Sequence, residues 1–426
     1  MKNAILAVAA LGALNVVAGT VAKTVIRQNW PYDPTVTIDY ELAGELDERC
    51  DMEVGLEDAN GPIVGYANAF SGDLDGVKPG EHRIVWDPVK AGYENAAATS
   101  LKVTLTPRTS AAKYLVIEGL DTGSLTVTPL NDEPSGGFNT DTYKKTKIAL
   151  RHIRAGRFRM GSPETEGGRN ANENPHDLIL TNDYWIGVFQ LTRRQWLYIK
   201  KDVTPTDHYS DSMTPAIGIS WNHICGENAS KKAGDVSTDV DEGSFLGLLG
   251  AKINAQLPPG YVVALPSEAQ WEYACRAGTT TAWNNGTDYN VYQKTATSGT
   301  YAGNTYWVDD NLTLLARYVW TTRGVEGGNN ATKVGRFLPN AWGLYDCHGG
   351  ANELVFDTIY VDGSSKGPDT TQVEQRICNL PGYRIIKGGT WNSNPAACRS
   401  ATRSNASRTT ASSEYGFRIA IIKEVK

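Results

Sequence analysis

The sequence lacks concentrated positive charge, and methionine is scarce. Lysine and arginine never form a run longer than two or three residues, and the formal net charge is -6. Nothing therefore predicts a nucleic-acid partner, because phosphate binding needs a concentrated basic face. The chain has 4 methionines against 20 tyrosines and 11 tryptophans. Aromatic side chains with a polar group suit ligand or partner surfaces as well as β-sheet packing.

Long apolar runs are also absent after the first twenty or so residues. Lys2 supplies a short positive region, and Ala4 to Ala18 is a nearly uncharged apolar run followed by small residues that suit cleavage near Ala18 or Ala22. This run is too short to span a bilayer with ease. We therefore predict a cleaved signal peptide at residues 1–22, no membrane span afterwards, and export to the periplasm, the cell surface or the extracellular medium.

The first part of the exported chain has the pattern of β-structure. Apolar and polar residues alternate over 36–42 and 101–105, and further short strand-like runs occur at 82–86, 113–118 and 124–130. Clusters of Gly, Pro, Asn and Asp separate these runs. Seven or eight short strands at this spacing predict an antiparallel, immunoglobulin-like β-sandwich over residues 23–130. No motif here carries chemistry, so we expect a spacer, a stalk or a docking module, with carbohydrate binding as an alternative.

A polar segment punctuated by Gly and Pro, residues 131–146, reads as a linker to a second domain over 147–426. In that domain Ser267 and Gln270 have the spacing of a capping box and predict a helix that begins at residue 268. Trp271 and Cys275 then lie one turn apart on one face. The stretch 284–311, rich in Thr, Asn, Gly and Tyr, is predicted to be irregular.

The C-terminal part resembles the formylglycine-generating enzyme (sulfatase-modifying factor) family. The matching blocks run in the family's order: Phe158–Ser162, Leu265–Gly278, Val334–Glu353, Lys387–Trp391, Ala401–Arg403 and Gly416–Arg418. The resemblance implies a C-type-lectin-like α+β domain in which little regular secondary structure supports long loops. It also implies a copper site in the active members, where two cysteines follow the aromatic residue of the Gly-Gly-Ser-Trp motif by two and seven positions.

The copper pair is incomplete in this chain. Ser393 stands at the first position and Cys398, by counting, at the second. If the protein were an oxidase these two would be its catalytic residues, but a hydroxyl is a hard, poor ligand for Cu(I), which favours two thiolates. We therefore expect no copper and no enzymatic activity, and keep conversion of a sulfatase cysteine to formylglycine as the alternative.

The resemblance also implies a calcium site and disulfides. The family's structural calcium loop falls on Asp346, Gly349, Ala351 and Glu353, whose hard oxygen ligands suit Ca²⁺; a tight turn without metal is the alternative. Six cysteines in an exported chain can pair. Family members bond a cysteine of the helix at 268 to one in the C-terminal loop, which implies Cys275–Cys398. Cys347–Cys378 is the second predicted pair, and Cys50 and Cys225 are left without an argued partner.

The loop from Asn392 to Glu414 is rich in Asn, Ser, Thr and Arg. Side chains of these types cannot build a core, and a long ordered loop is more often functional than accidental. We therefore predict a binding or display protein whose loop surface meets a protein or glycan ligand; a structural subunit of an extracellular assembly that binds copies of itself is a further alternative. The predicted ligand-binding residues are Trp391, Asn392, Ser393, Asn394, Arg399 and Asn405.

Overall fold

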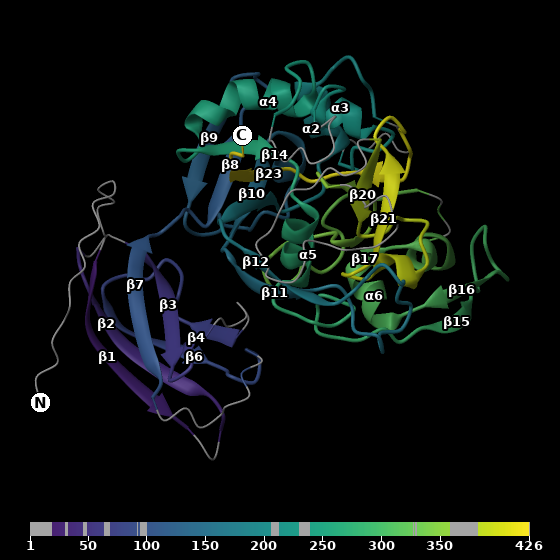
Figure 1. Cartoon of the computed structure of the whole chain (residues 1–426). Coiled ribbons are helices and arrows are strands. Elements are labelled where there is room, and N and C mark those ends of the chain that lie inside the picture. Colours follow the sequence, from purple (N-terminus) through teal and green to yellow (C-terminus); the bar gives the residue numbers. More distant parts are fainter. Residues whose placement is uncertain are drawn as a thin grey trace, which may run out of the picture. The chain divides into compact units, whose positions relative to one another are not determined.

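The computed structural model describes residues 19–29, 33–45, 49–63, 69–91, 93, 100–205, 213–229, 239–326, 328, 330–357 and 382–425. The chain divides into two compact units, with the division after Ala111 (Figure 1). Residues 1–18 of the predicted signal peptide lie outside the described residues. Among the described residues, no helix is both long enough and apolar enough to cross a membrane.

The first unit consists of two antiparallel sheets that share one core. Ile38, Ile84 and Trp86 from one sheet and Met52 and Leu56 from the other are buried in the same cluster. This arrangement agrees with a β-sandwich. One sheet has the order β1 (Thr20–Gln28), β2 (Val36–Ala43), β6 (Gly80–Trp86), β5 (Phe70–Gly72), and the other has the order β4 (Gly61–Ile63), β3 (Cys50–Asp58), β7 (Lys102–Thr109).

The boundary between the units lies earlier than the sequence pattern predicted. The runs at 113–118 and 124–130 do form strands, β8 (Tyr114–Glu118) and β9 (Thr126–Leu130), but both belong to the second unit. β8 pairs with β10 (Ile148–Ile153), with Leu115 opposite Leu150. Tyr114 to Ile117 are all buried, as expected of a strand covered on both faces rather than one at the edge of a sandwich. The predicted linker, 131–146, likewise lies within the second unit.

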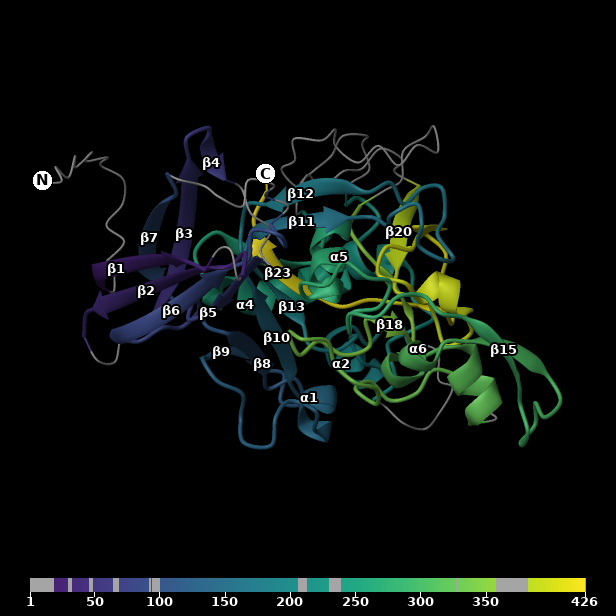
Figure 2. The same ribbon diagram turned by 90° about the horizontal axis from the view of Figure 1, so that it is seen from below.

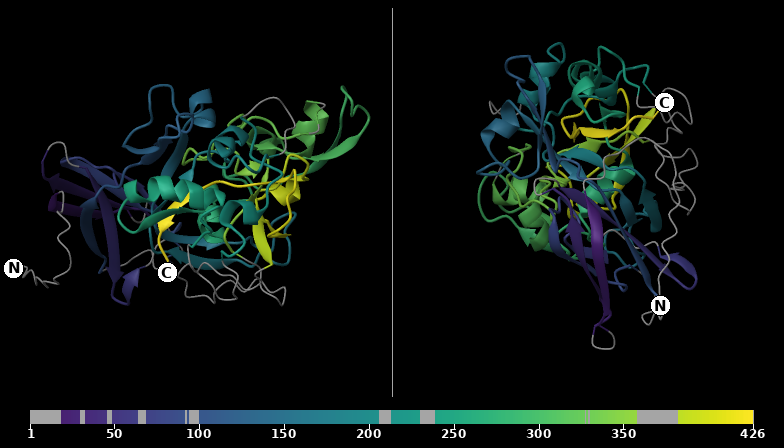
Figure 3. Two further views of the ribbon diagram at one scale, coloured as in Figure 1. Left: turned by 90° about the horizontal axis from the view of Figure 1, so that it is seen from above. Right: turned by 90° about the vertical axis from the view of Figure 1, so that its left-hand side faces the viewer.

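The second unit is built on a six-stranded sheet and several small ones. The C-terminal strand β23 (Ala420–Lys423) pairs with both β13 (Tyr184–Gly187) and β14 (Tyr261–Ala264), so the chain's end returns to the sheet with which the unit began (Figure 3). The six-stranded sheet has the order β14-β23-β13-β10-β8-β9. The smaller sheets are β11 (Gly156–Met160) with β12 (His176–Leu180), β15 (Tyr292–Thr295) with β16 (Thr305–Val308), β17 (Ala316–Arg317) with β18 (His348–Gly349), and the order β21 (Arg403–Ser407), β20 (Tyr383–Lys387), β19 (Asn352–Leu354), β22 (Tyr415–Gly416).

The helices of this unit are short and begin at polar caps. They are α1 (Asp141–Lys145), α2 (Arg193–Ile199), α3 (Trp221–Cys225), α4 (Phe245–Ile253), α5 (Glu268–Arg276) and α6 (Asp310–Leu315), with 3₁₀ turns at Asn254–Gln256 and Pro395–Cys398 and a π-helical turn at Trp320–Val325. The predicted capping box of α5 is confirmed, because Ser267 accepts from the Gln270 amide and Gln270 accepts from the Ser267 amide. Both bonds satisfy N–H groups that the helix leaves open at its start.

Helix α5 is the centre of the second unit. All nine of its residues are buried, and it packs beside β11 and β12 (Figure 2). Trp271 and Cys275 lie in the same core cluster as Phe158 of β11 and Ile385 of β20. A helix that is buried all round must also bury its polar side chains, and these need internal partners. The candidate site lies among these internal partners of α5.

Candidate functional site

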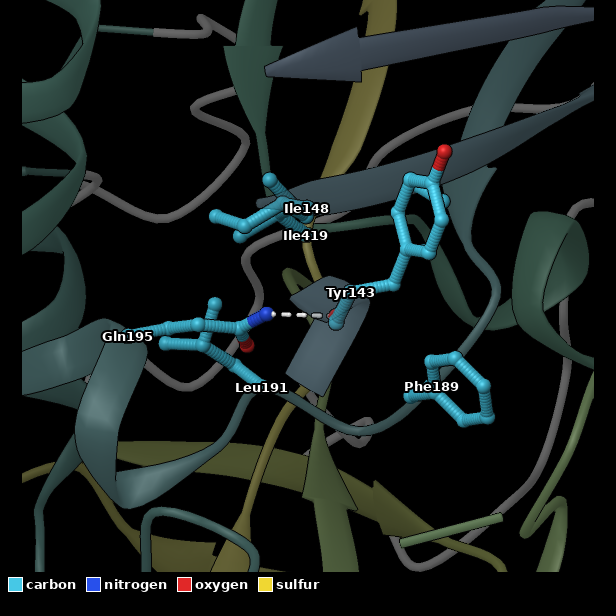
Figure 4. A pocket seen from close by; sticks show the side chains of 8 residues that line it. Tyr143, Ile148, Phe189, Leu191, Gln195 and Ile419 are labelled. Carbon is cyan, nitrogen blue, oxygen red and sulfur yellow. Dashed lines mark hydrogen bonds between the residues drawn. The ribbon is translucent and has the colours of Figure 1, made fainter. Parts of the chain in front are cut away.

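A small pocket beside α2 is apolar and carries no chemistry. Gln195, the polar side chain among its lining residues, uses its amide nitrogen to hold the Tyr143 carbonyl at 3.0 Å (Figure 4). The lining consists of Tyr143, Ile148, Ala149, Gly187, Phe189, Leu191, Gln195 and Ile419. None of these residues is charged at neutral pH, since tyrosine ionises only near pH 10. The buried charged groups lie instead around α5 and the C-terminal loop.

Glu272 of α5 joins three segments that are distant in the sequence. Its carboxylate accepts from the Gly161 amide at 2.9 Å, from Arg276 Nε at 2.9 Å and from Lys387 Nζ at 2.9 Å. Burial raises the pKa of this carboxyl, but the charges of Lys387 and Arg276 outweigh burial and lower it to about 2. Glu272 is therefore ionised and serves as a structural junction between α5, β11 and β20.

The two positions that correspond to the family's copper cysteines hold a hydroxyl engaged in a turn and a buried thiol. The Ser393 hydroxyl accepts from the Thr390 amide at 3.0 Å and lies 3.1 Å from the Thr390 hydroxyl, which closes a tight turn. Cys398 is fully buried, and burial raises the pKa of its thiol to about 12. A protonated thiol and a hydroxyl engaged in a turn are poor ligands for a soft ion.

The predicted Cys275–Cys398 disulfide is not formed. Both residues carry free thiols, and the group of the C-terminal loop that faces Cys275 is the Ser400 hydroxyl, 3.8 Å from its sulfur. Counting along the loop selected Cys398, but the residue that contacts α5 is Ser400, two positions later. Cys347 also carries a free thiol; Cys378, its predicted partner, lies outside the described residues.

Two of the predicted surface residues are buried. Trp391 packs against Ile217 and Ala351, and its indole N–H donates to the Ser413 carbonyl at 3.3 Å. Arg399 has no exposed surface. Its guanidinium donates to both carboxylate oxygens of Glu173, at 2.7 and 2.8 Å, and to Glu166. These two side chains hold the loop in shape and are not available to a ligand.

The exposed predicted residues do not all lie together. Asn392 and Asn394 are exposed and Ser393 is half-buried between them, while the Asn392 amide donates to Glu414 at 3.0 Å. Glu414 precedes β22, at one edge of the four-stranded sheet, whereas Asn405 is exposed on β21, at the opposite edge. With strands about 4.8 Å apart, three intervals separate the two groups by roughly 14 Å. The candidate surface is therefore the edge formed by Asn392, Ser393, Asn394 and Glu414.

The predicted calcium residues surround one point, and the Gln190 amide nitrogen occupies it. Gln190 Nε2 lies 3.1 Å from the Asp346 carbonyl, 3.3 Å from that of Gly349, 3.0 Å from that of Ala351 and 3.1 Å from Glu353 Oε1. We call these four oxygens the oxygen cage. Asp346 contributes its backbone oxygen, because its carboxylate accepts from the Gly335 amide at 2.6 Å.

Gln190 fits its place only in part. An amide nitrogen has two hydrogens for the four acceptors around it, and the buried Oε1 of Gln190 has no hydrogen-bond partner among the described residues. Which end of a glutamine amide is oxygen is assigned from its neighbours. A half-turn of the amide would direct Oε1 into the cage. Five oxygens would then face one another, and their mutual repulsion would need a cation between them.

Arg418 of the Gly-Phe-Arg motif supports the cage from outside. Its guanidinium makes two bonds of 2.6 Å to the Glu353 carboxylate and donates to the Gly187 carbonyl at 3.0 Å. The Trp271 indole N–H also donates to Glu353, at 2.6 Å. Burial raises the pKa of Asp346 to about 6, so the charge of this region depends on pH near neutrality.

Sequence reasoning missed Gln190, Glu166, Glu173 and Glu272. Glu272 lies inside the matching block Leu265–Gly278, but nothing in the local sequence indicated its partners or those of Gln190. Glu166 and Glu173 lie in a polar loop that carries no periodic signal. Their role follows only from the approach of Arg399, more than two hundred residues away in the chain.

Comparison with known proteins agrees with these motifs. A family model described as "Sulfatase-modifying factor enzyme 1-like domain" matches residues 140–423. The formylglycine-generating enzyme of Mycobacterium tuberculosis is 31% identical over 163 residues, which cover 36% of this chain and 49% of that protein. The enzyme of Bos taurus is 29% identical over 168 residues, covering 37% and 38%. The chain thus spans half or less of the length of these two relatives.

A third relative aligns over a greater length. The formylglycine-generating enzyme of Thermomonospora curvata is 22% identical over 322 residues, covering 67% of this chain and 98% of that protein. Among solved structures, PvdO from Pseudomonas aeruginosa covers 65% of this chain and 94% of its own at 23% identity, with a TM-score of 0.46. Treponema denticola variable protein 1 covers 65% and 95% at 20% identity, also with a TM-score of 0.46.

Proposed function

Because the chain belongs to the sulfatase-modifying factor family, which includes the formylglycine-generating enzymes, we propose that it is an exported, non-catalytic member that binds a polar ligand. The observation that carries this proposal is the chemistry at the two copper positions. Ser393 closes a turn with Thr390, and Cys398 is a fully buried, protonated thiol. The scaffold, which we take to be of the C-type-lectin-like type, then serves to hold a loop edge in one shape.

The proposed binding edge consists of Asn392, Ser393, Asn394 and Glu414. Its exposed side chains offer amide and carboxylate groups, which recognise hydrogen-bonding ligands such as glycans or polar protein loops. The edge is rigid, because Trp391 is buried beneath it and Thr322 Oγ1 donates to the Trp391 carbonyl at 2.7 Å. A preorganised edge loses less entropy when it binds.

Replacement of the two exposed asparagines tests this edge. We expect the wild-type protein to bind a subset of immobilised oligosaccharides or displayed peptides saturably, and the double variant Asn392→Ala/Asn394→Ala to lose about tenfold or more in affinity, since each lost hydrogen bond costs about 1 kcal/mol or more. Surface plasmon resonance on the best array hit gives the affinity. Asn182→Ala is the matched control, since Asn182 is exposed on the same unit. No saturable binding, or an equal loss in the control, would contradict the proposal.

We further propose that calcium stabilises the scaffold at the oxygen cage. Three backbone carbonyls, Glu353 and the rotated Gln190 amide would supply five oxygen ligands, the donor type that Ca²⁺ prefers. The buried, unpartnered Oε1 of Gln190 is what supports this proposal. The ion's role would be to fix the loop between Asp346 and Glu353, on which Gly388 and Trp391 also rest.

A thermal-shift titration tests the calcium proposal. We expect millimolar Ca²⁺ to raise the unfolding midpoint of the wild-type protein and a chelator to reverse the rise, because an ion at 100 times its dissociation constant adds about 2.7 kcal/mol. Gln190→Met keeps the size of the side chain but removes the oxygen. This variant should need about ten times more calcium for the same rise in the unfolding midpoint. If calcium did not change the unfolding midpoint of the wild-type protein, the proposal would be contradicted, and the Gln190 amide nitrogen would occupy the cage without an ion.

For the proposed export, the start of the first strand bears on where the signal peptide would be cleaved. Thr20 already pairs with Ala43 at the start of β1, so cleavage after Ala22 would remove the first three residues of this strand. We therefore propose cleavage near Ala18, which leaves β1 whole. The N-terminal sequence of the mature protein, purified from outside the cytoplasm, checks this directly; a start at Lys23 would contradict it.

A further inference from the structure

Two buried cysteines from different segments meet in the core of the second unit. Cys275 lies in the last turn of α5, and Cys347 lies just before β18. Both belong to the same core cluster, with 1% and 3% of their surfaces exposed, and their thiols lie close enough for each to shift the pKa of the other. Neither residue takes part in the proposed binding edge.

The two segments are fixed to each other on both sides of this pair. Before Cys347, the Asn340 amide donates to the carbonyls of Ala274 and Cys275, at 2.7 and 3.1 Å. After it, Glu353 accepts from the Trp271 indole at 2.6 Å. Both contacts join α5 to the segment that carries Cys347, so the two segments are fixed to each other on either side of the thiols.

No other sulfur competes for Cys275 among the described residues that contact its thiol. Its remaining polar neighbour is the Ser400 hydroxyl, at 3.8 Å, which cannot form a disulfide. Cys398 belongs to a different core cluster, with Trp283 and Tyr318. Its sulfur lies so close to Gly389 that a Cβ atom added to this glycine would be 2.6 Å from it. The sulfur of Cys398 therefore packs against the turn at Gly389.

We infer that Cys275 and Cys347 form an intramolecular disulfide in the oxidised protein, a bond that ties α5 to the loop that carries the oxygen cage. Formation removes two protons and two electrons from the thiols, and a disulfide-bearing oxidant accepts them and leaves as two thiols. Since both cysteines are buried, the exchange takes place during folding, before the core closes. The bond closes a loop of about seventy residues, which restricts the unfolded chain.

Peptide mapping without reduction tests the inference. The full-length protein is refolded in a buffer of reduced and oxidised glutathione, free thiols are alkylated under denaturing conditions, and the digest is analysed by mass spectrometry. We expect the peptides of Cys275 and Cys347 to be recovered as one cross-linked species that reduction separates. We also expect the oxidised protein to unfold on the order of 5–10 °C above the reduced protein.

The variants separate this bond from other effects of oxidation. Cys347→Met, which keeps an apolar sulfur-containing side chain but cannot form a disulfide, should abolish both the cross-link and the redox-dependent shift. Cys398→Ser should leave both unchanged, and it provides a second protein in which to observe the bond if Cys347→Met fails to fold. Recovery of Cys275 and Cys347 as separately alkylated peptides, or of Cys275 bonded to any other cysteine, would overturn the inference.

Discussion

Replacing Arg399 by alanine is expected to unfold the second unit or to lower its free energy of unfolding by at least about 3–5 kcal/mol. The guanidinium is fully buried between two carboxylates, Glu166 and Glu173. Removing one partner of a buried ion pair leaves uncompensated charge in the core, which is the costly case. Arg399 also donates to the Gly168 carbonyl at 2.7 Å, so the loop around Gly168 would lose its anchor as well.

Two comparisons separate this effect from a general cost of losing an arginine. Arg159→Ala removes a half-exposed arginine that contacts Asp177 at 3.1 Å and should cost no more than about 1 kcal/mol. The triple variant Arg399→Met/Glu166→Gln/Glu173→Gln removes all three charges together and should recover part of the loss. Chemical denaturation of the purified variants gives the free energies. If Arg399→Ala kept the stability of the wild-type protein but lost ligand binding, this account would be contradicted, and Arg399 would be a ligand-binding residue.

The second large effect is acid instability centred on Glu272. Its pKa in the folded protein is lowered to about 2, whereas an unfolded glutamate titrates near 4.3. A carboxyl with a lowered folded pKa contributes stability above its unfolded pKa and loses that contribution as the pH falls through its folded pKa. We therefore expect about 3 kcal/mol of stability to disappear between roughly pH 4.5 and pH 2.

The Glu272→Gln variant checks this assignment. At pH 7 it should be several kcal/mol less stable than the wild-type protein, because Lys387 and Arg276 lose the carboxylate between them. Its stability should fall less steeply below pH 4.5, so the two curves converge in acid. Glu242→Gln, at an exposed carboxylate, should leave the curve unchanged. Parallel wild-type and Glu272→Gln curves down to pH 2 would assign the acid instability to other carboxyls.

The sequence predicted the elements whose causes are local. Ser267 and Gln270 lie three residues apart, so their capping box and the helix that follows could be read directly, and the alternation at 36–42 gave β2 in the same way. The stretch 284–311 was predicted to be irregular, yet it contains the hairpin of β15 and β16. Its strands are mostly exposed, and polar residues such as Gln293 and Thr305 hide the alternation on which the prediction depended.

The candidate site was predictable only in its motifs. Trp391 and Arg399 lie in a polar loop, where exposure is the ordinary expectation, but they are buried by Ile217 and by Glu173, which come from distant parts of the chain. Spacing grouped Asp346, Gly349, Ala351 and Glu353, but a side-chain oxygen was expected from Asp346, and its backbone carbonyl lies there instead. The Gln190 amide that occupies the oxygen cage was not predicted, because about 160 residues separate it from the cage. Contacts of this range depend on the whole fold.

The cysteines show the same limit at the scale of two residues. The family pattern implied that Cys275 bonds the nearest cysteine of the C-terminal loop, and counting selected Cys398. In the fold the residue that meets α5 is Ser400, while a second cysteine, at 347, lies against Cys275 instead. The proposed pairing of Cys275 with Cys347 therefore follows from the packing around α5 and not from counting along the loop.

An anaerobic Cu(I) titration of the reduced wild-type protein, in competition with a colorimetric chelator, tests the central claim most directly. We expect no stoichiometric copper binding and no conversion of a cysteine-containing sulfatase peptide to formylglycine when oxygen is admitted, because Ser393 offers a hydroxyl and Cys398 a buried, protonated thiol. One equivalent of Cu(I) bound through Cys398, together with turnover of the peptide, would contradict the account and identify the protein as an oxidase.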